Sequence, residues 1–178
     1  MSEESSSTER NRNIWAPWRM EYIDSLSEKP GACFLCRYRD EVGSDARNLV
    51  LWRGPRTLTV LNRFPYTGGH SMVAPLEHVA DLVDLDDATL LELLRSIRDL
   101  RQVLSRALRA EGFNIGINIG RCAGAGLPGH LHAHLVPRWP GDTNFMPVFG
   151  GVRVIPQTLE ALYEQVQQAA RDLALPKL

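Results

Sequence analysis

The sequence predicts an α+β fold in which an antiparallel sheet of about five strands carries one long helix and is followed by a C-terminal helix. Three short segments with β-type patterning precede the longest amphipathic helical segment. Two further alternating segments, separated by a glycine-rich loop, follow it, and a second amphipathic segment lies near the end of the chain. No internal repeat or second domain is visible in the sequence.

Composition indicates one domain. The chain has 178 residues, of which 44% are hydrophobic and 23% charged, enough for a substantial core. Residues 1–12 are polar and are expected to form a disordered tail, because they offer nothing to offset the entropy of ordering. We expect residues 13–178 to form a single domain with an N-terminal arm and a C-terminal helical extension.

Charge and hydropathy exclude several classes of partner. The 20 Lys and Arg residues against 21 Asp and Glu give a net charge of −1, which argues against a nucleic-acid partner. No apolar run approaches the ~20 residues of a membrane span, and the first residues are polar where a secretory signal is apolar. We therefore expect a cytoplasmic protein with no membrane partner.

Two features precede the predicted sheet. Trp15 and Trp18 lie so close together that their segment is expected to dock, either on the domain, at an oligomer contact or beside the ligand pocket. Cys33 and Cys36 follow the turn at Pro30-Gly31, and their spacing suits two thiolates that bind one Zn²⁺. With only three cysteines in the chain, this pair predicts a metal or redox site and no disulfide framework.

The next segments predict three strands and a long helix. Residues 49–52, 57–61 and 70–75 are β-patterned with short connections, which favours an antiparallel meander. Acidic residues at 84–87 can cap a helix that Gly112 would end. Its apolar positions recur at three and four: Leu90, Leu94, Ile97, Leu100, Leu104, Ala107 and Leu108. The opposite face is expected to be solvated: Arg95, Arg98, Asp99, Arg106 and Arg109.

Two strands and a helix complete the prediction. Residues 113–120 alternate strictly, and the loop that follows is rich in small residues. Residues 130–136 then predict a strand with three histidines at alternate positions, so that all three side chains share one face and Leu131, Ala133 and Leu135 point into a core. Pro156 and Thr158 are typical of the start of a helix, here the C-terminal one.

The three histidines allow two kinds of chemistry. Imidazole can attack phosphorus to give a covalent intermediate, and the backbone amides of Gly124, Gly126 and Gly129 can wrap phosphate oxygens. Alternatively, one or two histidines can complete a zinc site with the cysteine pair, and His78 is a candidate further ligand. A closed site with two cysteines and two histidines would be structural and would leave the other histidines for catalysis.

The segment His130-Leu131-His132-Ala133-His134-Leu135-Val136 resembles the signature of the histidine-triad (HIT) superfamily of nucleotide hydrolases and transferases, in which three histidines alternate with apolar residues. The likeness extends over nearly the whole chain from about Ile14. Three flanking segments are similar to the branch that includes bacterial diadenosine tetraphosphate (Ap4A) phosphorylases: residues 15–19, 62–66 and 137–147.

The resemblance implies roles for single residues. His132 would be the nucleophile that forms a nucleotidyl-histidine, and His134 would contact the phosphate and assist the leaving group. His130 would orient the strand or, as in zinc-bearing relatives, complete a metal site whose other ligands match Cys33, Cys36 and His78. Asn62 stands where many members have an acid that holds the ribose hydroxyls. Asn118 matches a phosphate-contacting asparagine, and the family also implies a homo-oligomer.

One departure bears on the reaction. Many hydrolytic members carry Gln-Ser or Gln-Thr shortly before the triad, whereas this chain has Gly126-Leu127. This favours an enzyme that uses inorganic phosphate as acceptor and cleaves Ap4A to ADP and ATP. A hydrolase of Ap4A-like or phosphoramidate substrates is the first alternative, and a non-catalytic nucleotide-binding protein is the second. The role of Cys122, beside the loop, stays open.

Overall fold

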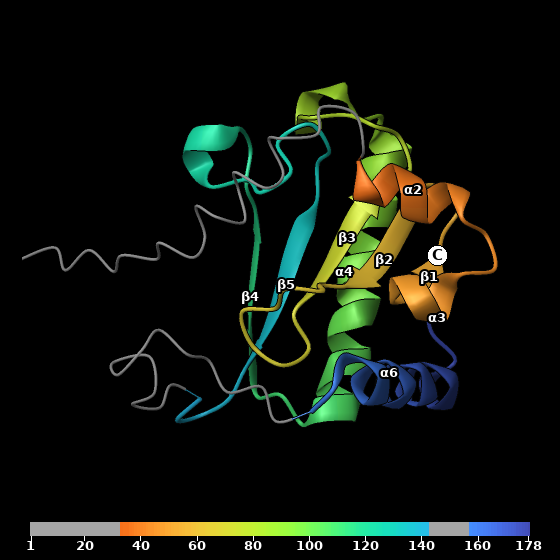
Figure 1. The fold of residues 1–178 in the computed structure, drawn as a ribbon, viewed down its shortest axis with the longest axis vertical. Coiled ribbons are helices and arrows are strands. Elements are labelled where there is room, and N and C mark those ends of the chain that lie inside the picture. Colours follow the sequence, from red (N-terminus) through yellow and green to blue (C-terminus); the bar gives the residue numbers. More distant parts are fainter. Residues whose placement is uncertain (1–32, 143–156) are drawn as a thin grey trace, which may run out of the picture.

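The fold is described from a computed structural model, in which residues 33–142 and 157–178 are the described part of the chain. Five antiparallel strands form one sheet in the order β1-β2-β3-β5-β4 (Figure 1). The strands are β1 (Val50–Arg53), β2 (Thr57–Leu61), β3 (Ser71–Pro75), β4 (Gly112–Ile117) and β5 (Ala133–Arg138). The helices are α2 (Phe34–Asp40), α3 (Asp45–Asn48), α4 (Asp87–Leu108) and α6 (Leu159–Leu173), with short 3₁₀ helices η1 (Leu82–Asp84) and η2 (Arg121–Ala123). The predicted α+β class is confirmed.

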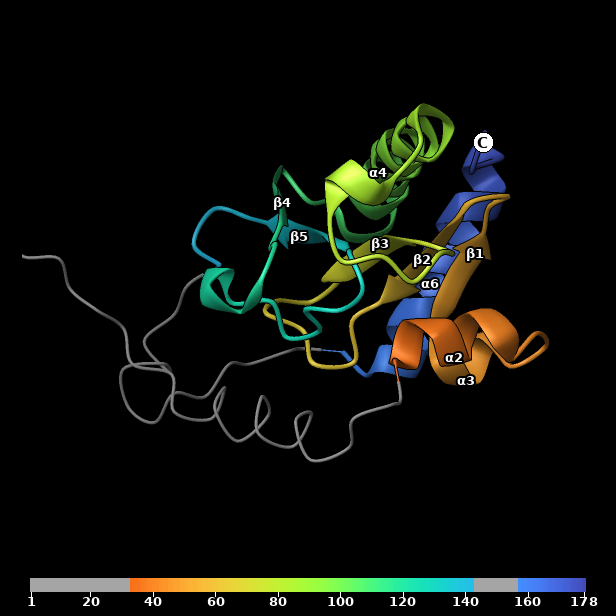
Figure 2. The ribbon, with the colours of Figure 1, turned by 90° about the horizontal axis from the view of Figure 1, so that it is seen from above.

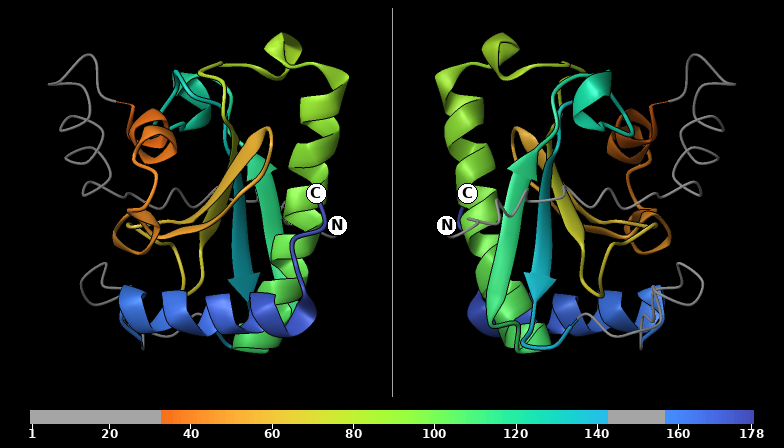
Figure 3. Two further views of the ribbon diagram at one scale, coloured as in Figure 1. Left: turned by 90° about the vertical axis from the view of Figure 1, so that its right-hand side faces the viewer. Right: turned by 90° about the vertical axis from the view of Figure 1, so that its left-hand side faces the viewer.

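Apolar side chains cover both faces of the sheet. The long helix α4 packs on one face and α2 on the other, as Figures 2 and 3 show. The larger core joins sheet residues to α4 and α6: Leu49, Leu51, Trp52, Leu61, Val73, Ala133 and Leu135 with Leu93, Ile97, Leu100, Val103, Leu104, Leu162, Val166, Ala169 and Ala170. The smaller core joins the opposite face to α2: Val50, Leu58, Val60, Met72 and Ala74 with Leu35 and Tyr38.

This arrangement decides on which side the site lies. Ala133 and Leu135 point into the core beneath α4, as the sequence predicts. His134, between them, is paired with Met72, which belongs to the α2 face. Since successive side chains of a strand point to opposite faces, the imidazole of His134 lies on the face away from α4.

The long helix differs from its prediction at its end and in its exposed face. Asp86 caps its start by accepting a hydrogen bond from the Thr89 N–H at 2.7 Å. Its last residue is Leu108, and the cap after it is Arg109, with a left-handed φ of 52°, and not Gly112, which begins β4. Asp99, predicted to be solvated, is fully buried, and its carboxylate accepts hydrogen bonds from the Lys177 N–H in the C-terminal tail at 2.7 Å and from Arg98 at 2.8 Å.

The apolar stripe of α4 is rotated relative to the predicted one. Leu94 is 63% exposed, whereas Leu93 lies in the core. Polar residues occupy part of the buried face, where Glu92 accepts hydrogen bonds from the Thr57 hydroxyl at 2.9 Å and the Arg56 N–H at 2.8 Å. These bonds allow a carboxylate to be buried at a position where the sequence shows no apolar residue.

Strand boundaries also differ, for reasons visible in the backbone. The predicted strand 113–120 ends at Ile117, and the predicted strand 130–136 begins only at Ala133. In the register that pairs Val73 with Ala133, Ala74 would come opposite His132 and Pro75 opposite Leu131. Proline has no N–H to donate, so the ladder stops there, and the Leu131 N–H bonds to the Val79 carbonyl at 2.7 Å. His130 and His132 therefore precede the strand.

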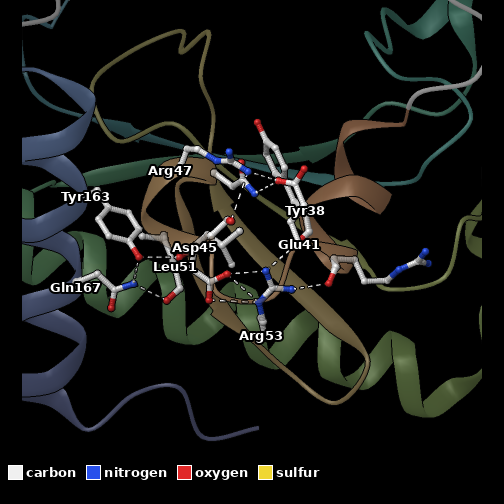
Figure 4. Close-up of polar contacts among 12 residues, drawn as sticks. Tyr38, Glu41, Asp45, Arg47, Leu51, Arg53, Tyr163 and Gln167 are labelled. Carbon is white, nitrogen blue, oxygen red and sulfur yellow. Dashed lines mark hydrogen bonds and ion pairs between the residues drawn. The ribbon is translucent and has the colours of Figure 1, made fainter.

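Helix α6 is confirmed and has Thr158 as its cap, which accepts a hydrogen bond from the Ala161 N–H at 3.3 Å. Its Tyr163 hydroxyl donates to the Val50 carbonyl at 3.1 Å and Gln167 to the Leu51 carbonyl at 2.6 Å, both on β1 (Figure 4). Two short helices, α2 and α3, were not predicted.

Some predictions fall elsewhere in the chain. The tail at residues 1–12, the Trp15 and Trp18 segment, the Pro30-Gly31 turn and Pro156 lie outside the described residues. Within residues 33–142 and 157–178, none of the helices has the length and apolar character needed to cross a membrane.

Candidate functional site

Four predicted metal ligands meet at one place. Cys33 caps the start of α2, Cys36 lies in its first turn, His78 follows β3 and His130 precedes β5. One ligand atom from each of these residues lies within 4.8 Å of all the others, and we call this group the metal cluster. The Sγ of Cys33 is 3.1 Å from Nδ1 of His130, and the Sγ of Cys36 is 3.3 Å from Nδ1 of His78.

The spacing of the metal cluster fits zinc. Ligand atoms at tetrahedral corners about 2.0 to 2.3 Å from Zn²⁺ lie roughly 3.3 to 3.8 Å apart. The sulfur-to-nitrogen distances of 3.1, 3.3 and 3.5 Å are close to that range. Two thiols and two imidazoles are also the donor set of closed structural zinc sites. The residues present therefore fit the metal that the sequence predicts.

Hydrogen bonding fixes which nitrogen of His130 faces the sulfurs. Its Nε2 is 2.9 Å from the Pro75 carbonyl, which can only accept, so Nε2 carries the proton and Nδ1 is left as a ligand. Burial lowers the pKa of His130 to about 4, so the ring is neutral near pH 7. Burial raises the pKa of the Cys33 thiol to about 11, so a thiolate at this position requires a nearby cation.

His132 is held in the opposite tautomer. Its Nδ1 is 2.8 Å from the His130 carbonyl, so Nδ1 carries the proton and the lone pair is on Nε2. The side chain is 4% exposed, and burial lowers the pKa of the ring below its usual value. A neutral imidazole with a free Nε2 and an anchored Nδ1 is suited to nucleophilic attack, because the carbonyl stabilises the positive charge that develops on the ring.

His70, to which the sequence analysis assigns no role, contacts His134. The backbone N–H of Tyr66 donates to His70 Nδ1 at 3.1 Å, which places the proton of His70 on Nε2. That Nε2 lies 3.0 Å from His134 Nδ1 and donates to it, so His134 carries its own proton on Nε2. His134 is thereby prepared as a hydrogen-bond donor. The sequence offered one indication of this contact: residues 70 and 72 share a face of the predicted strand 70–75.

Of the two predicted asparagines, Asn62 lies beside His70. Its Nδ2 is 3.3 Å from His70 Nδ1, and its Oδ1 accepts the Phe64 N–H at 2.9 Å. Asn118 follows the last pair of the β4–β5 hairpin, Ile117 with Ala133, so the same register would set it opposite His132. The roles of both asparagines toward a nucleotide stay predictions.

The predicted phosphate loop reaches the metal cluster at its last glycine, Gly129. Gly124 has a left-handed φ of 81°, and its N–H bonds to the Arg121 carbonyl at 3.0 Å. A side chain added at Gly129 would lie 3.5 Å from His78 Nε2, so this residue borders the metal cluster. Gly126, which lies between Gly124 and Gly129 in the sequence, is half-buried. Cys122 is exposed in η2.

Comparison with known proteins agrees with this geometry. The model of the HIT domain family matches residues 44–141, which is more than half of the chain. The chain belongs to the HIT domain family. It is 39% identical to the AP-4-A phosphorylase of Mycobacterium tuberculosis over 158 residues, which cover 83% of this chain and 78% of that protein.

Two further relatives of this HIT protein bear on the site. The bis(5'-nucleosyl)-tetraphosphatase (asymmetrical) of Schizosaccharomyces pombe is 36% identical over 93 residues, 52% of this chain and 50% of that one. The crystal structure of a Zn-bound histidine triad family protein from Mycobacterium smegmatis superposes with a TM-score of 0.65 and 26% identity, covering 80% of this chain and 96% of that chain.

Proposed function

We propose that this HIT protein is a nucleotidyl-transfer enzyme that cleaves dinucleoside polyphosphates, with Ap4A and inorganic phosphate as substrates and ADP and ATP as products. The observation that carries the proposal is the anchored tautomer of His132, which leaves a nucleophilic nitrogen beside the proton-bearing His134. The two rings are 4.8 Å apart between centroids, so both can reach one phosphate group. A module that only binds nucleotides has no need of this arrangement.

The first half-reaction transfers a nucleotidyl group to the enzyme. His132 Nε2 attacks the α-phosphorus of Ap4A, a P–N bond forms, and the P–O bond to the remaining phosphate chain breaks to release ATP. The His130 carbonyl accepts a hydrogen bond from His132 Nδ1–H throughout and stabilises the positive charge on the ring. His134 donates its Nε2 proton as a hydrogen bond to the departing oxygen, while His70 holds the ring in place.

The second half-reaction regenerates the histidine. An oxygen of inorganic phosphate attacks the phosphorus, the P–N bond breaks, and ADP leaves with His132 neutral again. Support for phosphate as acceptor comes from the Gly126-Leu127 sequence before the triad and from the identity with a protein named AP-4-A phosphorylase. Asn62 and Asn118 are proposed to bind the ribose and a phosphate, and Gly124, Gly126 and Gly129 to surround the phosphates.

A HIT hydrolase is the second candidate, favoured by the identity with a protein named bis(5'-nucleosyl)-tetraphosphatase. In that reaction water attacks the same nucleotidyl-histidine, so the two enzymes differ only in the acceptor. Products distinguish them, because phosphorolysis of Ap4A yields ADP and ATP whereas hydrolysis of the same intermediate yields AMP and ATP.

We also propose that the metal cluster binds one structural Zn²⁺. The cluster uses two thiols and two imidazoles, and the neighbouring solved structure described as Zn-bound supports the assignment. When bound, zinc would fix the cysteines relative to the histidines. The residues that act on phosphorus are His132 and His134, which lie outside the cluster.

The test is product analysis of purified protein with Ap4A, in phosphate-free buffer and with added phosphate. We expect turnover that depends on phosphate and yields ADP and ATP in equal amounts. AMP and ATP formed equally fast without phosphate would contradict phosphorolysis and identify a hydrolase. Tight Ap4A binding without turnover under either condition would contradict both enzymes.

A further inference from the structure

Helix α2 determines where both cysteines of the metal cluster lie. It has seven residues, with Cys33 as its cap and Cys36 in its first turn. A helix this short is not stable by itself in water, so its position depends on contacts with the rest of the protein. Leu35 and Tyr38 pack on the sheet, but apolar contacts have no preferred direction and specify the orientation of a helix weakly. Directional contacts are needed as well.

Arg53 of β1 supplies one set of directional contacts, at the end of α2. Its Nη1 donates to the Arg39 carbonyl at 2.9 Å and its Nη2 to the Tyr38 carbonyl at 2.7 Å, while Asp45 of α3 pairs with the same guanidinium at 2.5 Å (Figure 4). The other two terminal carbonyls of the helix, at positions 37 and 40, accept backbone N–H groups at 2.9 and 3.0 Å. Arg53 therefore completes the hydrogen bonding of this helix end.

Arg39 supplies the second set, from α2 to the end of β3. Asp40 orients its guanidinium through bonds of 2.7 and 3.1 Å, and its Nη1 donates to the Leu76 carbonyl at 2.9 Å. The preceding carbonyl, that of Pro75, accepts the His130 ring. Two successive peptide groups thus position the helix that carries the cysteines and the ring of a histidine ligand.

We propose that Arg39 and Arg53 are positioning residues of the metal cluster, which hold α2 so that its two sulfurs face the two histidines. The proposal rests on the zinc site proposed above and adds two residues that bind no metal themselves. The guanidinium of Arg53 joins a carboxylate to two backbone carbonyls and that of Arg39 joins a carboxylate to one, in a planar fork that an ammonium group cannot reproduce. Hydrogen bonds of this kind outside the ligand shell commonly set metal affinity.

The experiment measures Zn²⁺ affinity by competition with a chromophoric chelator, and site geometry by the absorption spectrum of the Co²⁺-loaded protein. We expect Arg53→Gln and Arg39→Gln each to weaken Zn²⁺ binding about 10- to 100-fold and to alter the Co²⁺ spectrum. Arg53→Lys should lose less, because one carbonyl can still be reached. The matched control is Arg37→Gln on the same helix, where an exposed arginine is removed with the same loss of charge.

Unchanged affinity in both Arg39→Gln and Arg53→Gln would overturn the proposal. An equal loss in Arg37→Gln would also overturn it, because charge and not position would then be the cause. Thermal unfolding in excess chelator shows whether each variant folds. If Arg53→Gln does not fold, the Zn²⁺ affinities of Arg39→Gln and Arg53→Lys test the proposal in its place. Wild-type protein that takes up neither metal would overturn the metal cluster and this proposal together, while product analysis still judges the chemistry of His132 separately.

Discussion

His130 of the metal cluster and the pair His132 and His134 come from one five-residue stretch, yet they are prepared for different chemistry. His130 donates from Nε2 to a carbonyl and turns Nδ1 toward two sulfurs. His132 donates from Nδ1 to a carbonyl and keeps the lone pair on Nε2. The identity of the residue is the same, and the backbone group that accepts its proton decides its role. We call the metal cluster the metal half of the site and the pair His132 and His134 the phosphate half. Variants that affect one half without the other test this division.

The largest effect is expected from His132→Ala. Loss of the nucleophile should lower turnover of Ap4A by at least about 10⁴-fold, while zinc stoichiometry and the melting temperature in the presence of zinc stay near the wild-type values. Steady-state kinetics with metal analysis of the same preparation measure both. Turnover within tenfold of wild type would contradict the nucleophile assignment.

Cys33→Ser should act mainly on the metal half. Serine is a good helix cap, so α2 retains its start while one metal ligand is removed. At free zinc about 1,000 times the dissociation constant, the free energy of unfolding should fall by about 4 kcal/mol relative to wild type. Chemical denaturation with and without chelator measures this. If wild-type protein is equally stable in both conditions, zinc does not stabilise the fold.

A smaller effect is expected from His70→Ala, on the phosphate half. His134 would lose the donor that fixes its tautomer, so turnover should fall about 10- to 100-fold, equivalent to roughly 1.4 to 2.7 kcal/mol, with zinc affinity unchanged. Because His134 assists departure of the leaving group, a substrate with a more acidic leaving group should lose less. An equal loss for both substrates would contradict the proposed role of His134.

Cys122→Ser should have the smallest effect. This thiol is exposed in η2 and is not one of the four cluster residues. Zinc affinity and turnover are each expected to stay within about twofold of wild type, as for most exposed substitutions away from a site. A loss of zinc affinity would show that Cys122 contributes to the metal cluster, and a loss of turnover would show that it contributes to the reaction of His132 and His134.

Sequence patterns predicted the features that rest on periodicity and spacing. The order of strands and helices follows from alternation and from the helical repeat, and the four ligands of the metal cluster were predicted from residue type and family resemblance. Contacts distant in sequence were not predictable in the same way. The buried Asp99 bonds to the C-terminal tail, 78 residues away in the sequence, and His70 meets His134 when β3 pairs with β5.

Two further differences between the predicted and the observed elements have local causes. The residues responsible are visible in the sequence, but their effect on the backbone is not. Pro75 stops the ladder opposite Leu131, so a segment with perfect alternation is only partly a strand. Arg109 follows the long helix in a left-handed conformation that glycine adopts most easily. Because an arginine is not expected in that conformation, the sequence pointed to the next glycine, Gly112, as the end of the helix. The short helices α2 and α3 have too few residues for a periodic signal.

The position of α6 has a consequence for assembly. Its Tyr163 and Gln167 occupy carbonyls of β1, so that margin of the sheet is obstructed for strand addition by another molecule. At the opposite margin, within residues 33–142 and 157–178, β4 pairs with β5 on one side and its residues 114–116 are exposed. Among the residues that the structure describes, the two margins of the sheet therefore differ in how much of their backbone is open to a further strand.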